Sequence, residues 1–244
     1  MVNRIKEVST WLVMGMVFCG LLGMLSYQYL VFGVDTIVIH GEDQLSEEEI
    51  IAAAHVEAQQ MLWNIDLKQV ESNLENLPWI QSSSIKRSLP NQLEIKINER
   101  SPRYQLQLMD KRVVLMDEKG IFLDYVDSSD PWDGDTELIE VPLELELGMK
   151  PSNVSEERWD CLLEILNWKD TLVGQRAFRM TKLTDQEMEF WLTKRLKVEV
   201  SDMIDGPYIV DMLARIVSDL SRKGISEGTI QLEAGYDARF LQEE

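Results

Sequence analysis

The chain has 244 residues, a formal net charge of −19 and 45% hydrophobic residues. This length allows one or two domains, and the hydrophobic content is enough to build their cores. Because such an acidic chain repels phosphate groups, we expect no nucleic-acid partner and no electrostatic attraction to anionic lipids. The two cysteines, Cys19 and Cys161, stand in an apolar run and in a predicted helix, so no disulfide framework is expected.

An apolar segment without charged residues extends from Val8 to Phe32. It is long enough to span a bilayer as a helix, which takes about 20 residues. Arg4 and Lys6 precede it and acidic residues follow it, so the positive-inside rule places the N-terminus in the cytoplasm and the bulk outside. The expected parts are a cytoplasmic tail over 1–10 and a transmembrane helix over 11–32.

A cleaved signal peptide is the alternative interpretation of this segment. It requires a shorter apolar core and small residues before the cleavage site. Ser26-Tyr27-Gln28-Tyr29 follows Leu25 and offers no such site, which favours an uncleaved anchor.

Small residues recur along one face of the predicted transmembrane helix. Gly15, Cys19 and Gly23 are spaced four apart, which lets another helix approach closely. We expect a transmembrane helix partner at this seam, with incidental composition as the alternative.

The next region, 34–102, is predicted as one compact domain that begins with a strand and two helices. Residues 35–40 alternate and are rich in β-branched residues, which indicates a strand. Ser46 with Glu49 forms a capping box for a first helix, and Asp66 with Gln69 is expected to do the same for a second.

Apolar side chains line one face of the second helix, and Pro78 ends it. Two strands follow, at 80–87 and 93–98. In the second strand Leu93, Ile95 and Ile97 are predicted to point inward, and the order of elements is β-α-α-β-β. Trp79 is interpreted as a core residue packed on the helix face formed by Leu67, Val70, Leu74 and Leu77.

This domain resembles the POTRA domain of the FtsQ/DivIB cell-division family. The family pattern is a strand ending in glycine, a helix, a second helix ending in a Leu-Pro-Trp motif, and two strands that lead to a Glu-x-x-Pro motif. The matching segments are Leu77-Pro78-Trp79-Ile80, Lys86-Arg87-Ser88-Leu89-Pro90, Leu93-Glu94-Ile95 and Glu99-Arg100-Ser101-Pro102. The predicted anchor and its orientation also fit this family.

Residues 103–240 are predicted to form a mixed β domain with two helices, similar to the C-terminal β domain of the family. The first helix, 154–168, carries Trp159, Leu162, Leu163 and Leu166 on one stripe, and the second opens at Gly206-Pro207. Strands are expected at 104–108, 112–116, 121–125, 178–183, 188–193, 196–200 and 229–232. The fold class is therefore a single N-terminal transmembrane helix followed by an α+β chain.

An acidic segment near 127–146 interrupts the β domain. Its acids have no basic neighbours and fail the spacing of a calcium-binding loop, so a solvated loop is expected, with a divalent cation site as the alternative. We predict no metal.

The sequence offers no catalytic constellation. His40 and His55 are the only histidines, and neither has a cysteine or carboxylate at ligand spacing. Nucleotide-binding, serine-nucleophile and zinc-protease motifs are missing. We therefore predict a non-enzymatic binding module without cofactor or small-molecule substrate, rather than an anchored hydrolase.

The resemblance implies a divisome scaffold at the septum of the inner membrane, which binds small coiled-coil membrane partners of the FtsB and FtsL type through its last strands. The family often has Asp-Leu-Arg-Tyr where this chain has Gln231-Leu232-Glu233-Ala234, and the basic residues usual before the last long helix are replaced by Asp202 and Asp205. Recognition is therefore expected to lean on main-chain pairing and on apolar side chains. The predicted partner-binding residues are Leu232, Glu233, Ala234, Gly235, Tyr236 and Phe240.

A membrane-anchored POTRA-type chaperone or polypeptide-binding module of the envelope is the second candidate function. Such modules usually have several POTRA repeats and a membrane barrel, whereas this sequence shows one such unit. A concentration of the protein at midcell would favour the division scaffold over this alternative.

Overall fold

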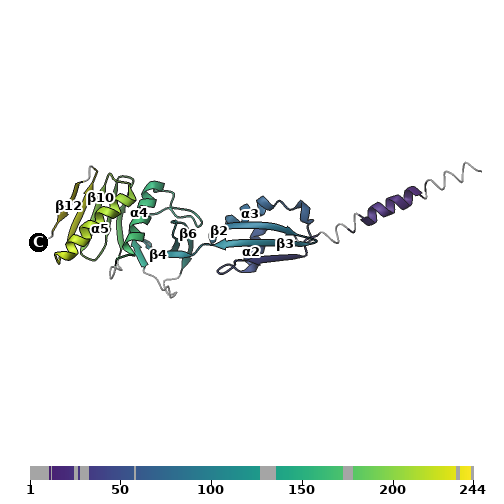
Figure 1. Cartoon of the computed structure of the whole chain (residues 1–244), viewed down its shortest axis with the longest axis horizontal. Helices are drawn as coiled ribbons and strands as arrows, with labels where there is room; N and C mark the ends of the chain where they lie inside the picture. The colour runs from purple at the N-terminus through teal and green to yellow at the C-terminus, as the bar shows by residue number, and fades with distance from the viewer. Residues whose placement is uncertain are drawn as a thin grey trace, which may run out of the picture. The chain divides into compact units, whose positions relative to one another are not determined.

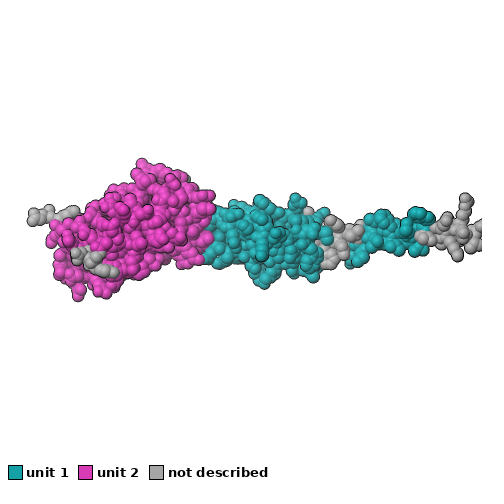
Figure 2. Space-filling model, turned by 90° about the horizontal axis from the view of Figure 1, so that it is seen from above, with its two compact units in different colours: residues 1–99 teal, residues 100–244 magenta. Residues whose placement is uncertain are grey.

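The computed structural model describes Trp11, residues 13–24, Tyr27, and residues 33–57, 59–126, 136–172, 178–234 and 237–242. The chain divides into two compact units, Met1–Glu99 and Arg100–Glu244, which Figure 2 shows in teal and magenta. Each unit has its own sheet and its own hydrophobic core (Figure 1).

Residues 13–24 form a helix in the predicted transmembrane segment. Gly15, Cys19 and Gly23 lie on this helix and are exposed, and nothing lies within 4 Å of a Cβ placed on either glycine. Residues 1–10, 12, 25, 26 and 28–32 lie outside the described residues. Among those that are described, no helix combines the length and the apolarity needed to cross a bilayer.

The first unit contains a three-stranded sheet in the order β1-β3-β2, with β1 parallel and β2 antiparallel to β3. The β-α-α-β-β order predicted from the sequence is confirmed. The elements are β1 (Thr36–His40), α2 (Glu47–Ala54), the short 3-10 helix η1 (Leu62–Asn64), α3 (Leu67–Glu75), β2 (Ile80–Ser88) and β3 (Gln92–Glu99).

Only one of the two predicted capping boxes forms. The Ser46 hydroxyl accepts from the Glu49 amide, and the Glu49 carboxylate accepts from the Ser46 amide. The bonds that the amide and the hydroxyl of Ser46 donate to this carboxylate hold the pKa of Glu49 below its ordinary value. Asp66 caps α3 by accepting from the amides of Lys68 and Gln69. The Gln69 side chain donates to the Asn73 side chain instead of bonding back to the Asp66 amide, so the prediction of a second capping box is wrong.

Alternation along β3 places its apolar side chains in the core of the first unit. Leu93, Ile95 and Ile97 are buried there together with Val70 and Leu74 of α3, as the sequence predicts. The interpretation of Trp79 as a core residue is wrong. Its side chain is only half-buried and lies outside this cluster, where Ile80 is buried instead.

The second unit is a nine-stranded mixed sheet in the order β12-β11-β10-β9-β8-β7-β4-β5-β6. Helices α4 (Glu156–Lys169) and α5 (Gly206–Arg222) cover one face (Figure 1), and their buried side chains share a cluster with those of the strands. The strands are β4 (Pro102–Leu108), β5 (Val113–Asp117), β6 (Phe122–Val126), β7 (Thr136–Ile139), β8 (Arg179–Leu183), β9 (Glu187–Trp191), β10 (Leu196–Ser201), β11 (Gly228–Glu233) and β12 (Asp237–Leu241).

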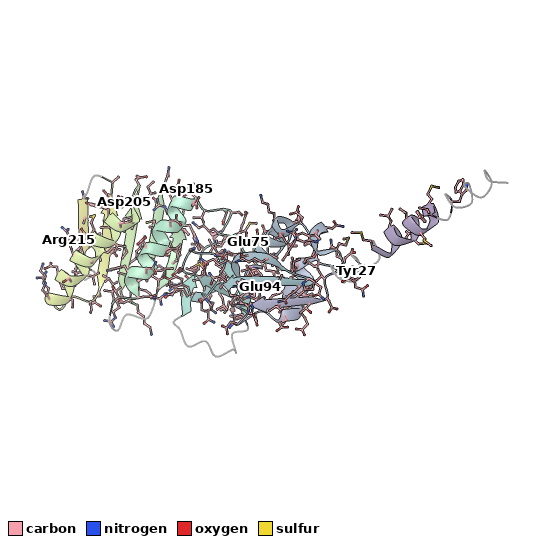
Figure 3. All side chains as sticks on the ribbon, turned by 45° about the vertical axis from the view of Figure 1, so that its right-hand side comes forward. Tyr27, Glu75, Glu94, Asp185, Asp205 and Arg215 are labelled. Atoms are coloured by element: carbon pink, nitrogen blue, oxygen red, sulfur yellow. The ribbon has the colours of Figure 1, made fainter. Side chains whose placement is uncertain are left out.

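Both predicted helices of the second unit form where the sequence places them. Trp159, Leu162, Leu163 and Leu166 of α4 are buried, as is Cys161, and burial raises the pKa of its thiol to about 11. Asp205, labelled in Figure 3, caps α5 by accepting from the Tyr208 amide at 3.0 Å.

Part of the acidic segment is a buried strand rather than a solvated loop. Residues 127–135 lie outside the described residues, but β7 follows directly and pairs in parallel with both β4 and β8. Glu137 is only 1% exposed and forms an ion pair with Lys169 of α4. The prediction of a solvated loop is therefore wrong over β7. No cluster of residues able to hold a metal ion occurs among the described residues.

The end of the second sheet also differs from the prediction. The sequence places the last strand at 229–232, whereas β12 follows β11 and pairs antiparallel with it. Consequently β11 lies between β10 and β12, and β12 rather than β11 is the outermost strand.

Candidate partner-binding edge

Strand β12 ends the second sheet, since it pairs with β11 on one side and no described strand lies on the other. The register aligns Ala238 with Leu232, Arg239 with Gln231, and Phe240 with Ile230. An edge strand presents N–H and C=O groups that another chain can pair with. The main chain of β12, like that of β6 at the other end of the sheet, can therefore receive an extended peptide by strand addition.

The side chains of β12 fall on two faces. Phe240 is partly buried and packs against the core that lies under α4 and α5. Arg239 and Leu241 alternate with it and point to the opposite, outer face, where Leu241 is 50% exposed. An arriving strand would therefore find an apolar contact, Leu241, next to a positive charge, Arg239.

Gly228 of β11 lets β12 lie close. Its φ is +138°, a conformation that side chains rarely adopt, and a Cβ placed there would come within 2.6 Å of the Phe240 ring. Gly228 also donates its amide to the Arg195 carbonyl at 3.0 Å. The close approach of β12 to the start of β11 thus depends on the glycine at position 228.

The six residues predicted from the sequence lie in different surroundings. Leu232 is fully buried in the core, so its side chain is not at the surface. Glu233 and Ala234 are exposed at the end of β11, whereas Gly235 and Tyr236 lie outside the described residues. Phe240 lies on the edge strand itself. Their role in partner binding stays a prediction.

The prediction missed Arg239 and Leu241. Asp237–Leu241 is short and has no β-branched residue, so its strand signal is weak. The available signal was the glycine at 235, because a short glycine-containing segment between two strand candidates is typical of a hairpin.

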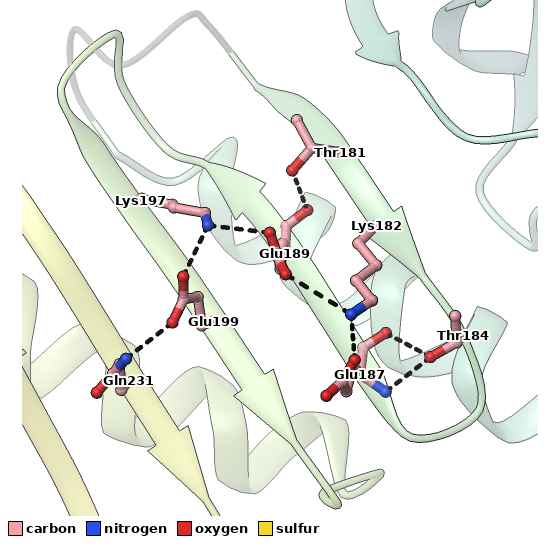
Figure 4. A network of polar contacts seen from close by, with 8 residues as sticks. All are labelled: Thr181, Lys182, Thr184, Glu187, Glu189, Lys197, Glu199 and Gln231. Atoms are coloured by element: carbon pink, nitrogen blue, oxygen red, sulfur yellow. Dashed lines mark hydrogen bonds and ion pairs between the residues drawn. The ribbon is translucent and has the colours of Figure 1, made fainter.

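A ladder of charged side chains crosses the outer face beside this edge (Figure 4). Lys197 of β10 binds Glu199 at 2.7 Å and Glu189 of β9 at 2.9 Å, and Gln231 of β11 donates to Glu199 at 2.9 Å. Lys182 of β8 continues the ladder by pairing with Glu187. Acids and bases alternate across these strands, so neighbouring strands are linked by their side chains as well as by their main chains.

These contacts favour the charged forms of the ladder. The hydrogen bonds from Lys197 and Gln231 hold the pKa of Glu199 below its ordinary value, and the bond to Glu199 raises the pKa of Lys197. For the carboxylate, the resulting stabilisation is complete above the ordinary carboxyl pKa and is lost as the pH falls through the lowered pKa of Glu199. The ladder thus supports the sheet at neutral pH, and its charges are already paired before any partner arrives.

Residues 32–100 match the family described as POTRA domain, FtsQ-type. They form a POTRA domain of the FtsQ type. The matched range covers the elements from β1 to β3, so the resemblance to the FtsQ/DivIB family that the Leu-Pro-Trp and Glu-x-x-Pro motifs predict is confirmed.

Curated relatives that this chain matches are named as cell-division proteins. Cell division protein DivIB of Clostridium tetani is 27% identical over 104 residues, which are 43% of this chain and 39% of that protein. Cell division protein FtsQ of Syntrophotalea carbinolica is 31% identical over 98 residues, 40% of this chain and 30% of that protein. Cell division protein FtsQ of Koribacter versatilis is 26% identical over 128 residues, which are 50% of this chain and 37% of that protein. The chain thus matches less than two thirds of the length of each relative.

Proposed function

We propose that this protein is a membrane-anchored, non-enzymatic scaffold of bacterial cell division. The observation that supports the proposal is the FtsQ-type POTRA domain, whose relatives carry the names FtsQ and DivIB. It is followed by a second unit with an edge strand available for main-chain pairing. A scaffold acts by holding partners, and this combination supplies two separate folded surfaces for that purpose.

The proposed partners are small coiled-coil membrane proteins of the FtsB and FtsL type. A segment of such a partner would add to β12 as a further strand, with main-chain bonds giving affinity and Leu241 giving a side-chain contact. Glu233 stands where the family has a base, and Arg239 supplies a cation two register positions away, opposite Gln231. We propose that Arg239 takes over charge pairing with an acidic partner segment.

Localisation tests the division role. A fluorescent fusion of the full chain is expected to concentrate at midcell in dividing cells, and depletion of the protein is expected to give filaments without septa. An even distribution around the envelope in dividing cells, with normal septa after depletion, would instead favour a general polypeptide-binding module. The matched control is a fluorescent fusion of residues 1–33 alone, which include the apolar segment. This fusion is expected not to concentrate at midcell if the folded units direct the protein there.

Topology tests the proposed anchor. The charge difference across residues 8–32 predicts that a phosphatase reporter fused after Glu244, active only outside the cytoplasm, is active. The double variant Arg4→Glu and Lys6→Glu is the matched control, because it removes the bases that orient the segment and is expected to reduce that activity. An inactive reporter, with a cytoplasmic reporter active at the same position, would contradict the orientation.

A further inference from the structure

Two large apolar side chains stand exposed at one end of the POTRA domain. Trp63 of η1 is 56% exposed, and Leu89, which follows β2, is 60% exposed. Their neighbours Leu62 and Ile65 are buried, so η1 is held to the domain by the residues beside Trp63 rather than by Trp63 itself. Neither exposed side chain belongs to the hydrophobic core of the domain, and the Trp63 ring has a cation–π contact with Arg87.

Hydrogen bonds place both residues at the end of the domain where the chain enters from the predicted anchor. Gly33 forms a β-bridge with Met61, just before η1, and the main-chain amide of Val34 donates to the Gln60 carbonyl at 2.9 Å. On the other side, the main-chain amide of Asp35 donates to the carbonyl of Asn91, in the turn that contains Leu89, also at 2.9 Å. The entering chain is thus held between the segment of Trp63 and the turn of Leu89.

Arg87 fixes these two segments to one another. Its guanidinium donates to the carbonyls of Leu62 at 2.7 Å and Ile65 at 2.6 Å, and it lies 5.9 Å from the centre of the Trp63 ring. Since Arg87 is on β2, directly before the turn with Leu89, its contacts join that turn to η1. The exposed pair is held by a rigid framework rather than by a loose loop.

The distance from the anchor is short. The segment between Tyr27 and Gly33 spans at most about 20 Å when fully extended. An anchored helix would therefore keep this end of the domain beside the membrane surface. Indole rings favour the headgroup region of a bilayer, because one part of the ring is apolar and the N–H seeks a polar partner.

We propose that this end of the POTRA domain docks on the lipid surface, with Trp63 and Leu89 inserted among the headgroups. The inference rests on the proposed anchor and extends it from a tether to a fixed orientation of the domain. Asp35 and Glu57 are exposed at the same end, so the contact is apolar and does not depend on anionic lipids. Docking sets which way the domain faces its partners.

Trp79 provides a control within the same domain. It precedes the first residue of β2, whereas Leu89 follows the last, and the nine residues of that strand cover roughly 30 Å. If Trp63 touches lipid, Trp79 therefore lies far from it. Trp11, in the predicted transmembrane segment, reports separately on the anchor.

The experiment reconstitutes the full chain in phosphatidylcholine vesicles, with and without lipids brominated near the headgroup, and measures the quenched fraction of tryptophan fluorescence. Trp63→Phe is expected to lower that fraction, because it removes a quenched ring. Trp79→Phe is expected to raise it, because it removes an unquenched one. Leu89→Asp keeps every tryptophan and is also expected to lower it, because docking is weakened.

The outcomes separate docking from anchoring. If Trp11→Phe lowers the quenched fraction but Trp63→Phe and Leu89→Asp do not, the anchor stands and docking is overturned. If none of the three lowers it, both docking and the proposed anchor are overturned. A decrease with both Trp63→Phe and Leu89→Asp, together with the increase for Trp79→Phe, supports docking.

Discussion

Lys169→Met is expected to lower the free energy of unfolding of the second unit by about 3–5 kcal/mol, because it leaves a charged carboxylate in the core. Lys169 and Glu137 are each 1% exposed and form an ion pair between the end of α4 and β7. For a unit of this size, the loss corresponds to a fall of about 10 °C in melting temperature. Calorimetry of the full chain, resolved into its transitions, measures it.

Glu137→Leu is also expected to lower the free energy of unfolding of the second unit, by no more than about 3–5 kcal/mol. When Glu137 is replaced, Lys169 still has Asp170, whose carboxylate lies 3.4 Å from its ammonium. Asp170 in turn forms an ion pair with the exposed Arg103 at 2.8 Å. Lys169 therefore still belongs to a network of ion pairs that reaches the surface. A loss well above about 5 kcal/mol for Glu137→Leu would contradict this account.

The double variant Glu137→Leu with Lys169→Met is expected to be more stable than Lys169→Met alone. Replacing both members of a buried pair by apolar side chains leaves no uncompensated charge and is often neutral. The matched control is Arg215→Ala on α5 (Figure 3), whose ion pair with Asp211, at 2.7 Å, is exposed. That change is expected to cost less than about 1 kcal/mol.

The same ion pair shows why part of the fold could not be predicted from the sequence. Glu137 stands in an acidic segment, which is typical of solvated loops, and its partner Lys169 is far along the chain. No local pattern links the two residues. The strand β7 forms because β4 and β8 supply hydrogen bonds on both sides, and this non-local pairing overrides the local composition.

Local signals were sufficient where a segment's own pattern determines its structure. The alternation of Leu93, Ile95 and Ile97 predicts both the strand and its buried face, because side chains alternate strictly along a strand. Ser46 and Glu49 predict a helix start because their bonds are local. Trp79 shows the limit of this reasoning, since an apolar side chain beside a helix end can be half-buried outside the core as well as part of it.

The candidate site shows the same division. The sequence located the final segment of the β domain, and Phe240 does lie on the edge strand. The sequence pattern predicts one strand in this segment, at 229–232, whereas the structure has two, β11 and β12, which form a hairpin. The sequence therefore predicts Leu232 as a partner-binding residue, although its side chain is buried in the core under the helices.

Partner capture about tenfold weaker, by a protein that is otherwise folded, is the expected result of a proline at one position of β12. Consecutive N–H groups along a strand point in opposite directions. Of the Ala238 and Arg239 amides, one therefore faces β11 and the other faces solvent. Proline removes the donor without forbidding an edge-strand conformation.

The two variants Ala238→Pro and Arg239→Pro are thus a matched pair. The variant that loses the inner donor is expected to lower the melting temperature of the second unit, because it breaks the ladder with β11. The variant that loses the outer donor is expected to keep the melting temperature and to weaken capture about tenfold, since an unmade buried hydrogen bond costs about 1–3 kcal/mol. Co-purification of a small coiled-coil division protein from detergent-solubilised membranes measures capture.

Side chains provide a second arm of the same test. Leu241→Asp places a charge where an apolar contact is proposed and is expected to weaken capture, with little effect on unfolding because Leu241 is half exposed. Tyr236→Ala, which the sequence also predicts to weaken capture, affects a residue outside the described ones.

The control variants are Asp124→Pro and Tyr125→Pro in β6, the strand at the opposite edge of the sheet, because that edge is not proposed to bind. If the stable β12 variant and Leu241→Asp both capture the partner at wild-type levels, β12 is not the binding edge; if only the β6 variants lose it, the binding edge is β6.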